Sequence, residues 1–79
     1  KGSYSLVSET LSPQAPAVGR ALRDLEFPRN AVVCAILRRN DVVIPRGDVL
    51  FEAGDEVLAL VDEAAAQELA ALFGAAGPA

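Results

Sequence analysis

Three apolar stretches lie close together in the second half of the chain and predict its central sheet. They cover residues 31–37, 42–44 and 57–61. Each has the length of a strand, is rich in Val, Ile or Leu, and is bounded by turn residues. These stretches do not alternate with polar residues, which is typical of strands covered on both faces. We therefore expect a small sheet covered by helices, with another chain as a further candidate for cover.

Shorter patterns predict the remaining elements. Residues 4–7 fit a first strand with Tyr4 and Leu6 on one face, and the proline-containing residues 9–17 predict no regular element. A short helix is then predicted by apolar side chains that recur at helical spacing, namely Val18, Ala21, Leu22 and Leu25. We expect Gly19 within this helix to allow close approach to a neighbouring backbone.

Turn and capping residues complete the pattern. Residues 38–41 predict a tight hairpin, Pro45 ends the strand that follows it, and Gly54 is expected at positive φ. Asp62 is placed as the N-cap of a closing helix and Gly74 as the residue after its end. The predicted order is β-α-β-β-β-α, an α+β sandwich with helices packed on a mostly antiparallel sheet.

Length and composition favour one small domain that binds a partner. The 79 residues are 52% apolar, which is high for so small a chain and indicates that some apolar surface is buried against another protein. We assign residues 1–79 to a single domain, with residues 1–2 as the remnant of a linker or of cloning and residues 75–79 as a frayed tail. The alternative reading of the apolar fraction is simply an Ala-rich composition.

Charge and cysteine usage exclude several classes of protein. The net charge of −4 argues against nucleic-acid binding, which needs a basic surface. No apolar run approaches the roughly 20 residues that cross a bilayer, and no signal peptide is visible. The single Cys34 is expected in the core, and one cysteine excludes an internal disulfide, so we expect a reducing cytosol.

Residues that could carry chemistry are few, and we expect no enzyme. The chain has no His, and its Ser and Thr hydroxyls have no activating base beside them. A cation site could be built from the acids near the turns, Asp48, Glu52, Asp55 and Glu56, although acids at surface turns are far more often solvated. Arg38-Arg39 could hold an anion or be a solvated pair, and the Arg-Gly-Asp tripeptide at residues 46–48 is interpreted as a turn.

Four segments in a defined order carry a resemblance to a known family. They are residues 16–25 (PAVGRALRDL), 31–39 (AVVCAILRR), 43–48 (VIPRGD) and 50–61 (LFEAGDEVLALV). Together they resemble the TrkA C-terminal domain, also called the C-terminal half of the RCK (regulator of K+ conductance) domain. The resemblance covers nearly the whole chain and implies the β-α-β-β-β-α fold. One departure is that many members have a Thr after the Gly-Asp of the hairpin loop, where this chain has Val49.

The resemblance implies regulation of potassium transport. Such domains lie in the cytosol, attached to or associated with cation channels, transporters or antiporters of the membrane. They usually form homodimers, and part of the family binds cyclic di-AMP in the dimer cleft, whereas others bind different ligands or none known. The leading hypothesis is therefore a ligand-sensing regulatory domain without a resident cofactor. The alternatives are a purely structural dimerisation domain and a small enzyme, which the missing His disfavours.

The resemblance also implies where a ligand would bind. The family's cleft is lined by the segment that leads into the central strand and by the proline-bearing end of the following hairpin strand. Those two places in this chain are Arg29-Asn30-Ala31-Val32 and Pro45-Arg46. A cyclic dinucleotide would then contact Arg29 with a phosphate, Asn30 by a hydrogen bond, and Val32 and Pro45 with a base. The alternative is that Arg29 is an exposed loop residue and the cleft is empty.

Overall fold

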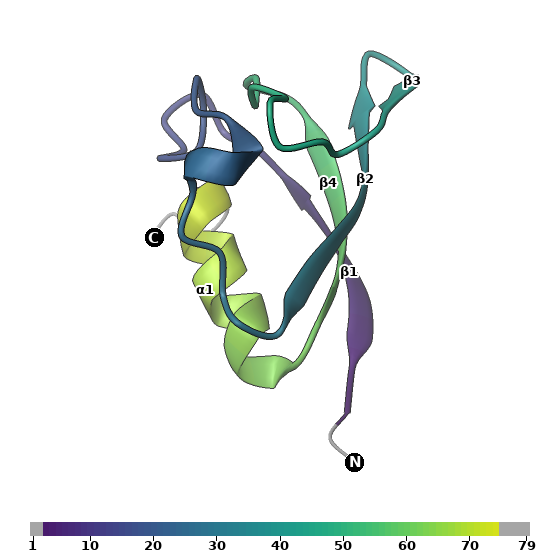
Figure 1. Cartoon of the computed structure of the whole chain (residues 1–79), viewed down its shortest axis with the longest axis vertical. Coiled ribbons are helices and arrows are strands. Elements are labelled where there is room, and N and C mark those ends of the chain that lie inside the picture. Colours follow the sequence, from purple (N-terminus) through teal and green to yellow (C-terminus); the bar gives the residue numbers. More distant parts are fainter. Residues whose placement is uncertain (1–2, 75–79) are drawn as a thin grey trace.

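The computed structural model describes residues 3–74, and the predicted remnant and frayed tail lie outside this range. Its elements in chain order are β1 (Ser5–Thr10), a 3-10 turn η1 (Leu22–Asp24), β2 (Ala31–Arg38), β3 (Asp41–Val43), β4 (Glu56–Val61) and α1 (Glu63–Phe73). The strands form one antiparallel sheet in the order β1-β4-β2-β3, and α1 lies across one of its faces (Figure 1). The predicted α+β fold class is confirmed.

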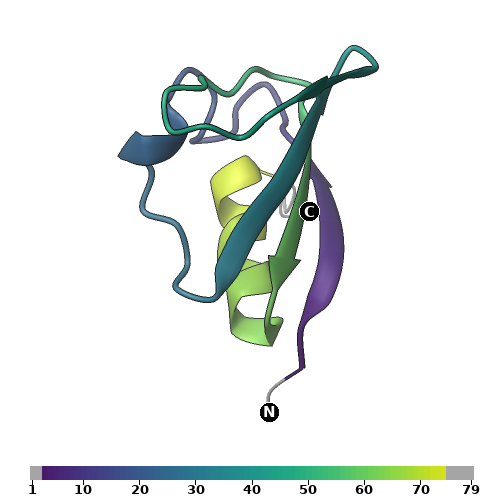
Figure 2. The ribbon, with the colours of Figure 1, turned by 45° about the vertical axis from the view of Figure 1, so that its right-hand side comes forward.

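The β2–β3 hairpin forms at the predicted residues. Its two turn residues, Arg39 and Asn40, have φ of 50° and 70°, the left-handed pair that matches the twist of two antiparallel strands. β3 is short because Pro45 offers no N–H to a ladder, and the chain turns away there with the Arg46 N–H donating to the Ile44 carbonyl. The segment beyond β3 thus leaves the sheet and crosses towards η1 (Figure 2).

Both ends of α1 are capped as the sequence predicts. The Asp62 carboxylate accepts a hydrogen bond from the Ala65 N–H at 2.8 Å, which satisfies one of the free N–H groups of the first turn. At the other end Gly74 adopts φ of 72°, and its N–H donates to the Ala70 carbonyl. The helix is thereby fixed with one apolar stripe, Ala65, Leu69 and Phe73, buried against the sheet.

The first predicted helix is wrong in kind. The chain forms only the three-residue turn η1 there, and Val18 and Ala21 make isolated bridges to Phe51 and Leu50 instead. Four apolar residues at helical spacing therefore pack against an irregular segment, whose backbone hydrogen bonds replace those of a helix. Gly19 has φ of 84°, and a Cβ added to it would meet no atom within 4 Å, so this glycine serves the turn and not a close approach.

The first strand is longer than predicted. β1 continues through Glu9 and Thr10, which pair with Val57 and Glu56 of β4, although the sequence pattern predicts no regular element from residue 9 onward. The prolines begin only at Pro13, and they therefore leave the ladder intact up to Thr10. β1 in this way forms an edge strand of the sheet and pairs with β4 along its full length.

The two faces of the sheet differ completely in cover. The inner face packs under α1 and the loops around η1, where the largest fully buried side chains are Phe51, Phe73, Leu11, Ile36, Leu69, Val57 and Val61. The opposite side, called here the outer face, carries the alternate residues of the strands, which the pairing registers align as Leu6, Ser8, Thr10, Val32, Ala35, Leu37, Val42, Glu56, Leu58 and Leu60. Within residues 3–74 the expected cover on both faces is present on the inner face only.

Cys34 is exposed, and its predicted place in the core is wrong. The pairing of β2 with β4 shifts between Val33 and Ala35, so Cys34 is the extra residue of a β-bulge and has no partner across the ladder. A bulge interrupts the alternation of side chains between the two faces of a sheet. The thiol of Cys34 is therefore exposed, although its neighbours in the sequence are apolar.

Among residues 3–74, no helix has the length and apolar character needed to cross a bilayer.

Candidate functional site

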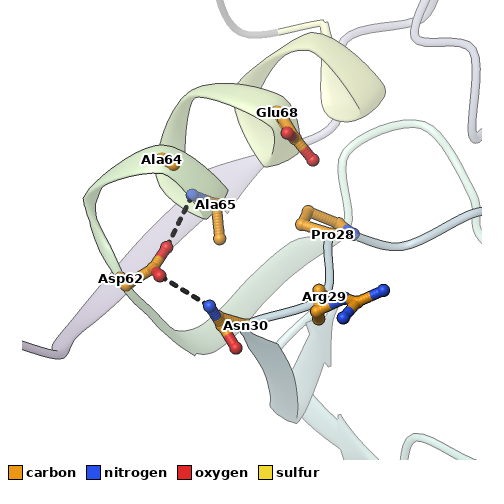
Figure 3. Close-up of a pocket in the computed structure, with 7 residues that line it drawn as sticks. All are labelled: Pro28, Arg29, Asn30, Asp62, Ala64, Ala65 and Glu68. Carbon is orange, nitrogen blue, oxygen red and sulfur yellow. Dashed lines mark hydrogen bonds between the residues drawn. The ribbon is translucent and has the colours of Figure 1, made fainter. Parts of the chain in front are cut away.

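The first group of predicted site residues lies where the chain enters the central strand. Asn30 is tied to the start of α1, since its Nδ2 donates to Asp62 Oδ2 at 2.8 Å and its carbonyl accepts from the Asp62 N–H at 3.2 Å (Figure 3). Asp62 therefore caps the helix with one oxygen and holds Asn30 with the other. This contact fixes the backbone at Arg29, and Ala31 and Val32 follow as the first two residues of β2.

A hollow lies beside this group. Its volume is about 90 Å³, and it is lined by Pro28, Arg29, Asn30, Asp62, Ala64, Ala65 and Glu68. Ligand pockets usually measure about 300–1,000 Å³, so the hollow admits a few waters and no nucleotide. The Arg29 guanidinium points away from α1 in Figure 3, and within residues 3–74 it makes no hydrogen bond or ion pair. Arg29 is thus free to meet an anion outside the hollow.

The second group, Pro45 and Arg46, lies just beyond β3. The register pairs Val43 with Ile36, and the antiparallel course of β3 carries the following residues towards the start of β2. Because β3 supplies only three pairs, no described strand covers residues 31–35 of β2 on that side; we call this stretch the free edge. Both groups border the free edge, but among the described residues no hydrogen bond joins them, so this part of the chain does not close a pocket around a ligand.

Arg23 is an additional cation near the second group that the sequence did not point to. Its N–H donates to the Gly47 carbonyl at 2.9 Å, and its Cβ lies 3.3 Å from where a Cβ on Gly47 would stand. The turn η1 is thereby held against the segment that follows Arg46. No spacing in the sequence relates Arg23 to residue 47, because the contact depends on the irregular packing of two loops.

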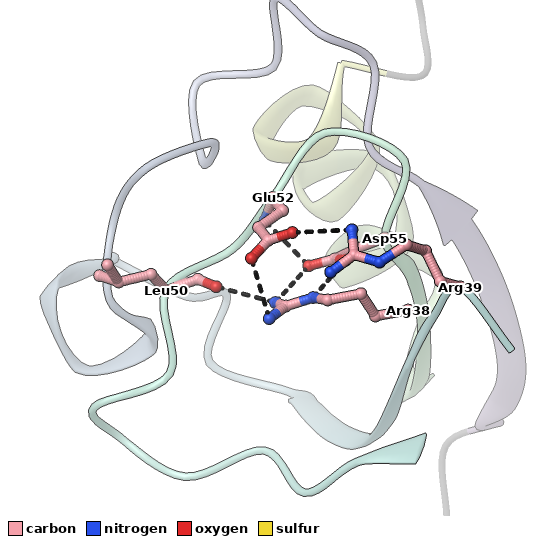
Figure 4. Close-up of polar contacts among 5 residues, drawn as sticks. All are labelled: Arg38, Arg39, Leu50, Glu52 and Asp55. Atoms are coloured by element: carbon pink, nitrogen blue, oxygen red, sulfur yellow. Dashed lines mark hydrogen bonds and ion pairs between the residues drawn. The ribbon is translucent and has the colours of Figure 1, made fainter. Parts of the chain in front are cut away.

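A buried ion pair forms the most connected polar cluster of the described residues (Figure 4). Asp55 is 1% exposed and accepts from Arg38 Nε at 2.9 Å and Nη2 at 2.8 Å, and also from the Glu52 N–H at 2.9 Å. Arg38 Nη2 donates further to the Leu50 carbonyl at 2.9 Å. The pair therefore fastens the end of β2 to the turn that precedes β4.

The protonation of Asp55 follows from these contacts. Burial acts to raise the pKa of the Asp55 carboxyl, but the hydrogen bonds from Arg38 and from the Glu52 N–H, together with the charges of Arg38 and Arg39, outweigh it and hold the pKa below its ordinary value. The hydrogen bond to Asp55 likewise raises the pKa of the Arg38 guanidinium. Both groups are charged at neutral pH.

This cluster bears on two groups that the sequence pointed to, the arginines at the hairpin and the acids near the turns. Arg38, with 18% of its side chain exposed, is neither a solvated arginine nor an open anion site, because Asp55 and Glu52 pair with it, and Arg39 also pairs with Glu52 at 3.3 Å. The acids near the turns do not gather around a cation, and residues 3–74 contain no group of three or more such side chains that could hold a metal. The sequence contained a signal for the Arg38–Asp55 ion pair, since Arg38 ends one apolar strand and Gly54-Asp55 precedes the next.

A larger hollow opens between the starts of β1 and α1. It measures about 350 Å³ and is lined by Ser3, Ser5, Val7, Val61, Asp62, Glu63 and Ala66. Its charged side chains are two carboxylates, which would repel a phosphate. The larger hollow therefore offers no arginine to an anionic ligand, whereas the smaller hollow has Arg29 at its border and the free edge has both Arg29 and Arg46.

Comparisons with known proteins agree on one family. The family model described as the TrkA-C domain matches residues 6–74. The chain is 38% identical over 72 residues to the Trk system potassium uptake protein TrkA of Mycobacterium tuberculosis, covering 91% of this chain and 33% of that protein. It is 31% identical over 77 residues to a TrkA homolog of Methanosarcina mazei, covering 98% of this chain and 17% of that protein.

A solved structure agrees in fold. It is described as an RCK domain with cda, has a TM-score of 0.73 and 23% identity, and covers 82% of this chain and 91% of that chain. The chain spans about a third or less of the length of the curated relatives given above. It corresponds to one part of these proteins, and with the family model matching most of its length, the chain belongs to the TrkA-C domain family.

Proposed function

We propose that this chain is a cytosolic, non-enzymatic regulatory domain of a potassium-uptake system, and that it acts as a homodimer on a channel, transporter or antiporter of the membrane. Membership of the TrkA-C family and the potassium-uptake proteins among its relatives support this role. We further propose that the homodimer senses cyclic di-AMP, or another nucleotide, in the cleft between its two copies. The solved relative described with cda supports a ligand of this kind.

The observation that carries the ligand proposal is the pair of arginines at the free edge of β2. Arg29 and Arg46 make no ion pair within residues 3–74, although the chain as a whole is acidic with a net charge of −4. A cyclic dinucleotide has two phosphates, two bases and two-fold symmetry. The hollow beside Arg29 is too small for it, at about 90 Å³, so a second copy has to complete the site.

The roles of the individual residues follow from their contacts. Arg29 pairs with a phosphate, since its guanidinium points away from α1 and makes no ion pair within residues 3–74. Asn30 has its Nδ2 committed to Asp62, which leaves Oδ1 to accept a hydrogen bond from an exocyclic amine of a base. Val32, which is 60% exposed, and Pro45 offer apolar contact to the base.

Titration calorimetry with cyclic di-AMP tests this proposal. We expect Arg29→Ala to weaken binding about ten-fold or more, because a charge-assisted phosphate contact contributes roughly 1.5–3 kcal/mol. Arg20→Ala is the matched control, since it removes an equal charge from an exposed side chain that is not part of the proposed site and donates to the Asp24 carbonyl. The ligand site is wrong if no heat develops at high micromolar protein, or if Arg29→Ala binds as well as the native chain.

A purely structural dimerisation domain is the second candidate. The apolar outer face favours it, because that face needs a partner and no ligand. The two candidates differ in one measurement. A sensing domain gains thermal stability when a nucleotide is added, since a ligand that binds only the folded state stabilises it, whereas a structural domain shows no shift with any nucleotide.

A further inference from the structure

The two edges of the sheet differ in how well they are protected against pairing with a further strand. At one edge β3 pairs over three residues only, Pro45 follows closely, and β2 is bulged at Cys34, where β3 no longer covers it. Short strands, prolines and bulges are the usual devices that prevent such pairing. The opposite edge is β1, which runs through six residues, Ser5–Thr10, with no proline and no shift in its register with β4.

The side of β1 that faces away from β4 is called here the β1 edge. β1 is the last strand in the order of the sheet, and among residues 3–74 no backbone hydrogen bond reaches it from that side (Figure 2). Every second residue of the strand therefore directs its N–H and its carbonyl away from the sheet. Glu9, the only charged residue of the strand, lies near its far end, so residues 5–8 form the open part of the β1 edge.

The larger hollow opens beside this part of the edge. Ser5 and Val7 line it from β1, Val61 from β4, and Glu63 and Ala66 from the first turns of α1. Its volume of about 350 Å³ lies within the range of ligand pockets. When a peptide adds a strand to a sheet, main-chain hydrogen bonds supply the affinity, and pockets beside the edge take alternate side chains of the added strand. The β1 edge and the hollow together have this arrangement.

The charges in this region restrict the chemistry of the added strand. β1, β4 and the segment from Asp62 to the end of α1 contain no Lys or Arg, and their charged residues are Glu9, Glu56, Asp62, Glu63 and Glu68. Both carboxylate oxygens of Asp62 accept hydrogen bonds, from Ala65 and Asn30. Glu63 is exposed and makes no ion pair within residues 3–74, so its carboxylate is available to a cation. A second copy of this chain would bring a β1 that carries an acid and no basic residue.

We propose that the β1 edge binds an extended basic segment of the membrane protein that the domain regulates. The segment adds a strand beside residues 5–8, and one of its Lys or Arg side chains lays its aliphatic part over Val7 and Ala66 in the hollow and its charge at Glu63. Cytosolic loops of membrane proteins carry an excess of Lys and Arg, and they are the source of this segment. The inference rests on the proposed function for the identity of the partner, and on the β1 edge and the hollow for the site.

NMR titration with a blocked synthetic peptide tests the site on the chain alone. The probe is Thr-Val-Lys-Val-Thr, whose Lys lies on one side of an extended strand and whose Val residues lie on the other. We expect binding in the upper micromolar to millimolar range, because ordering a short peptide offsets much of the interaction. Alternate amides of β1 should exchange with solvent several-fold more slowly near saturation, since they gain a hydrogen bond. The same peptide with Glu in place of Lys should bind about ten-fold or more weakly.

Substitutions in α1 separate the hollow from the general charge of the chain. Glu63→Gln should weaken binding of the Lys peptide roughly three- to five-fold, as expected for a partly exposed ion pair. Glu68→Gln is the matched control, since it removes an equal charge from an exposed side chain of the same helix that does not line the larger hollow. Ala66→Leu fills the hollow with another good helix former and should weaken binding at least as much as Glu63→Gln. Circular dichroism checks that each variant is folded.

Each outcome decides for or against the β1 edge. Protection confined to β1, with weaker binding in Glu63→Gln and Ala66→Leu but not in Glu68→Gln, supports the inference. No protection of β1 at several millimolar peptide, or equal binding of the Lys and Glu peptides, overturns it. Protection of β1 that grows with protein concentration in the absence of peptide would identify a second copy as the occupant and would also overturn it. A negative result removes this docking site and leaves calorimetry with cyclic di-AMP unaffected, just as absence of cyclic di-AMP binding leaves the peptide result unaffected.

Discussion

The inner and outer faces of the sheet are built from the same strands and differ only in which alternate residues they present. On the inner face Val57, Ala59 and Val61 of β4 are at most 1% exposed beneath α1. On the outer face Leu60 of the same strand is 40% exposed. The same backbone hydrogen bonds therefore hold the strands whichever face is considered, whereas side chains are fully buried on the inner face only. Within residues 3–74 the sheet is therefore packed by side chains on its inner face and left open on its outer face.

Because the two faces differ in cover, substitutions on them should affect different properties, namely the stability of one chain and its association with a second copy. Substitutions on the inner face should lower the free energy of unfolding at any protein concentration, since they act within one chain. Substitutions on the outer face should act mainly through the proposed dimer, and their effect should grow with concentration. The contrast between the faces can therefore be tested by substitutions whose expected effects range from several kcal/mol to almost none.

The largest effect is expected for Phe73→Ala. Phe73 is fully buried at the end of α1 and packs edge-on against Phe27 and tilted against Phe51, with ring centroids 6.2 and 5.3 Å away. Removing the ring leaves a cavity and should lower the free energy of unfolding by about 3–5 kcal/mol. Urea denaturation at low micromolar concentration measures this loss. If the variant does not fold, Phe73→Leu keeps most of the volume and should retain a cooperative transition.

Leu60→Ala is the counterpart on the outer face. At the same low concentration it should change the free energy of unfolding by only about 0.5 kcal/mol, as substitutions at exposed sites usually do. A loss that equals that of Phe73→Ala, at a concentration where the chain is monomeric, would show that the two faces do not differ as described.

The second largest effect is expected for Asp55→Ala. It leaves Arg38, whose side chain is 18% exposed, without its main partner, and it frees the Glu52 N–H. Removing one member of a largely buried ion pair should cost about 2–4 kcal/mol of unfolding free energy. Asp48→Ala, at an exposed acid of the preceding loop, is the control and should cost little. Equal stability of the two variants would mean that the Arg38–Asp55 pair does not fasten the fold.

A smaller effect is expected from pH. The pKa of Asp55 is lower in the folded chain than in the unfolded one, where it is about 3.9, so near and below that value the unfolded chain binds protons more readily. The stabilisation by Asp55 is fully present above about pH 5 and is lost as the pH falls through the folded pKa. Urea denaturation of the native chain at pH 7 and below pH 4 should show this loss, and Asp55→Asn should lose less over the same interval. An equal loss in both proteins would contradict the assignment.

Local structure could be predicted from the sequence where a single turn or capping residue determines it. Asp62 and Gly74 set the ends of α1, and the left-handed pair Arg39-Asn40 sets the hairpin; both predictions are confirmed. The helix predicted from Val18 onward failed, because helical spacing over only four apolar residues is also satisfied by a loop that packs against Phe51. The glycine at position 19 was the available signal against a helix there, and in the structure Gly19 has φ of 84°.

The candidate site could be predicted only in part, since its two groups lie on one edge but are not in contact within one chain. The spacing of Arg29 and Pro45 along the sequence does not indicate whether both would line a ligand site within one chain or in two different copies. Likewise, a wholly apolar strand such as β4 indicates cover on both faces without distinguishing a helix of the same chain from a second copy. The inner cover could be predicted from the stripe on α1, whereas nothing in residues 3–74 covers the outer face, and a second copy there is a proposal.

The smallest effect is expected at Cys34, and it reports on the outer face without any substitution there. The thiol lies in the bulge of β2 and is exposed, so in the monomer a thiol reagent should modify it about as fast as an unstructured cysteine. Cys34→Ser should change the free energy of unfolding by no more than about 0.5 kcal/mol, because no apolar layer receives the hydroxyl. As the concentration rises into the range of the dimer, modification should slow several-fold, since Cys34 is flanked along β2 by Val32 and Ala35 of the outer face. If modification is slow even at nanomolar concentration, the thiol of Cys34 is covered within a single chain. The outer face would then not be open at β2, and the described difference between the two faces would not hold for that strand.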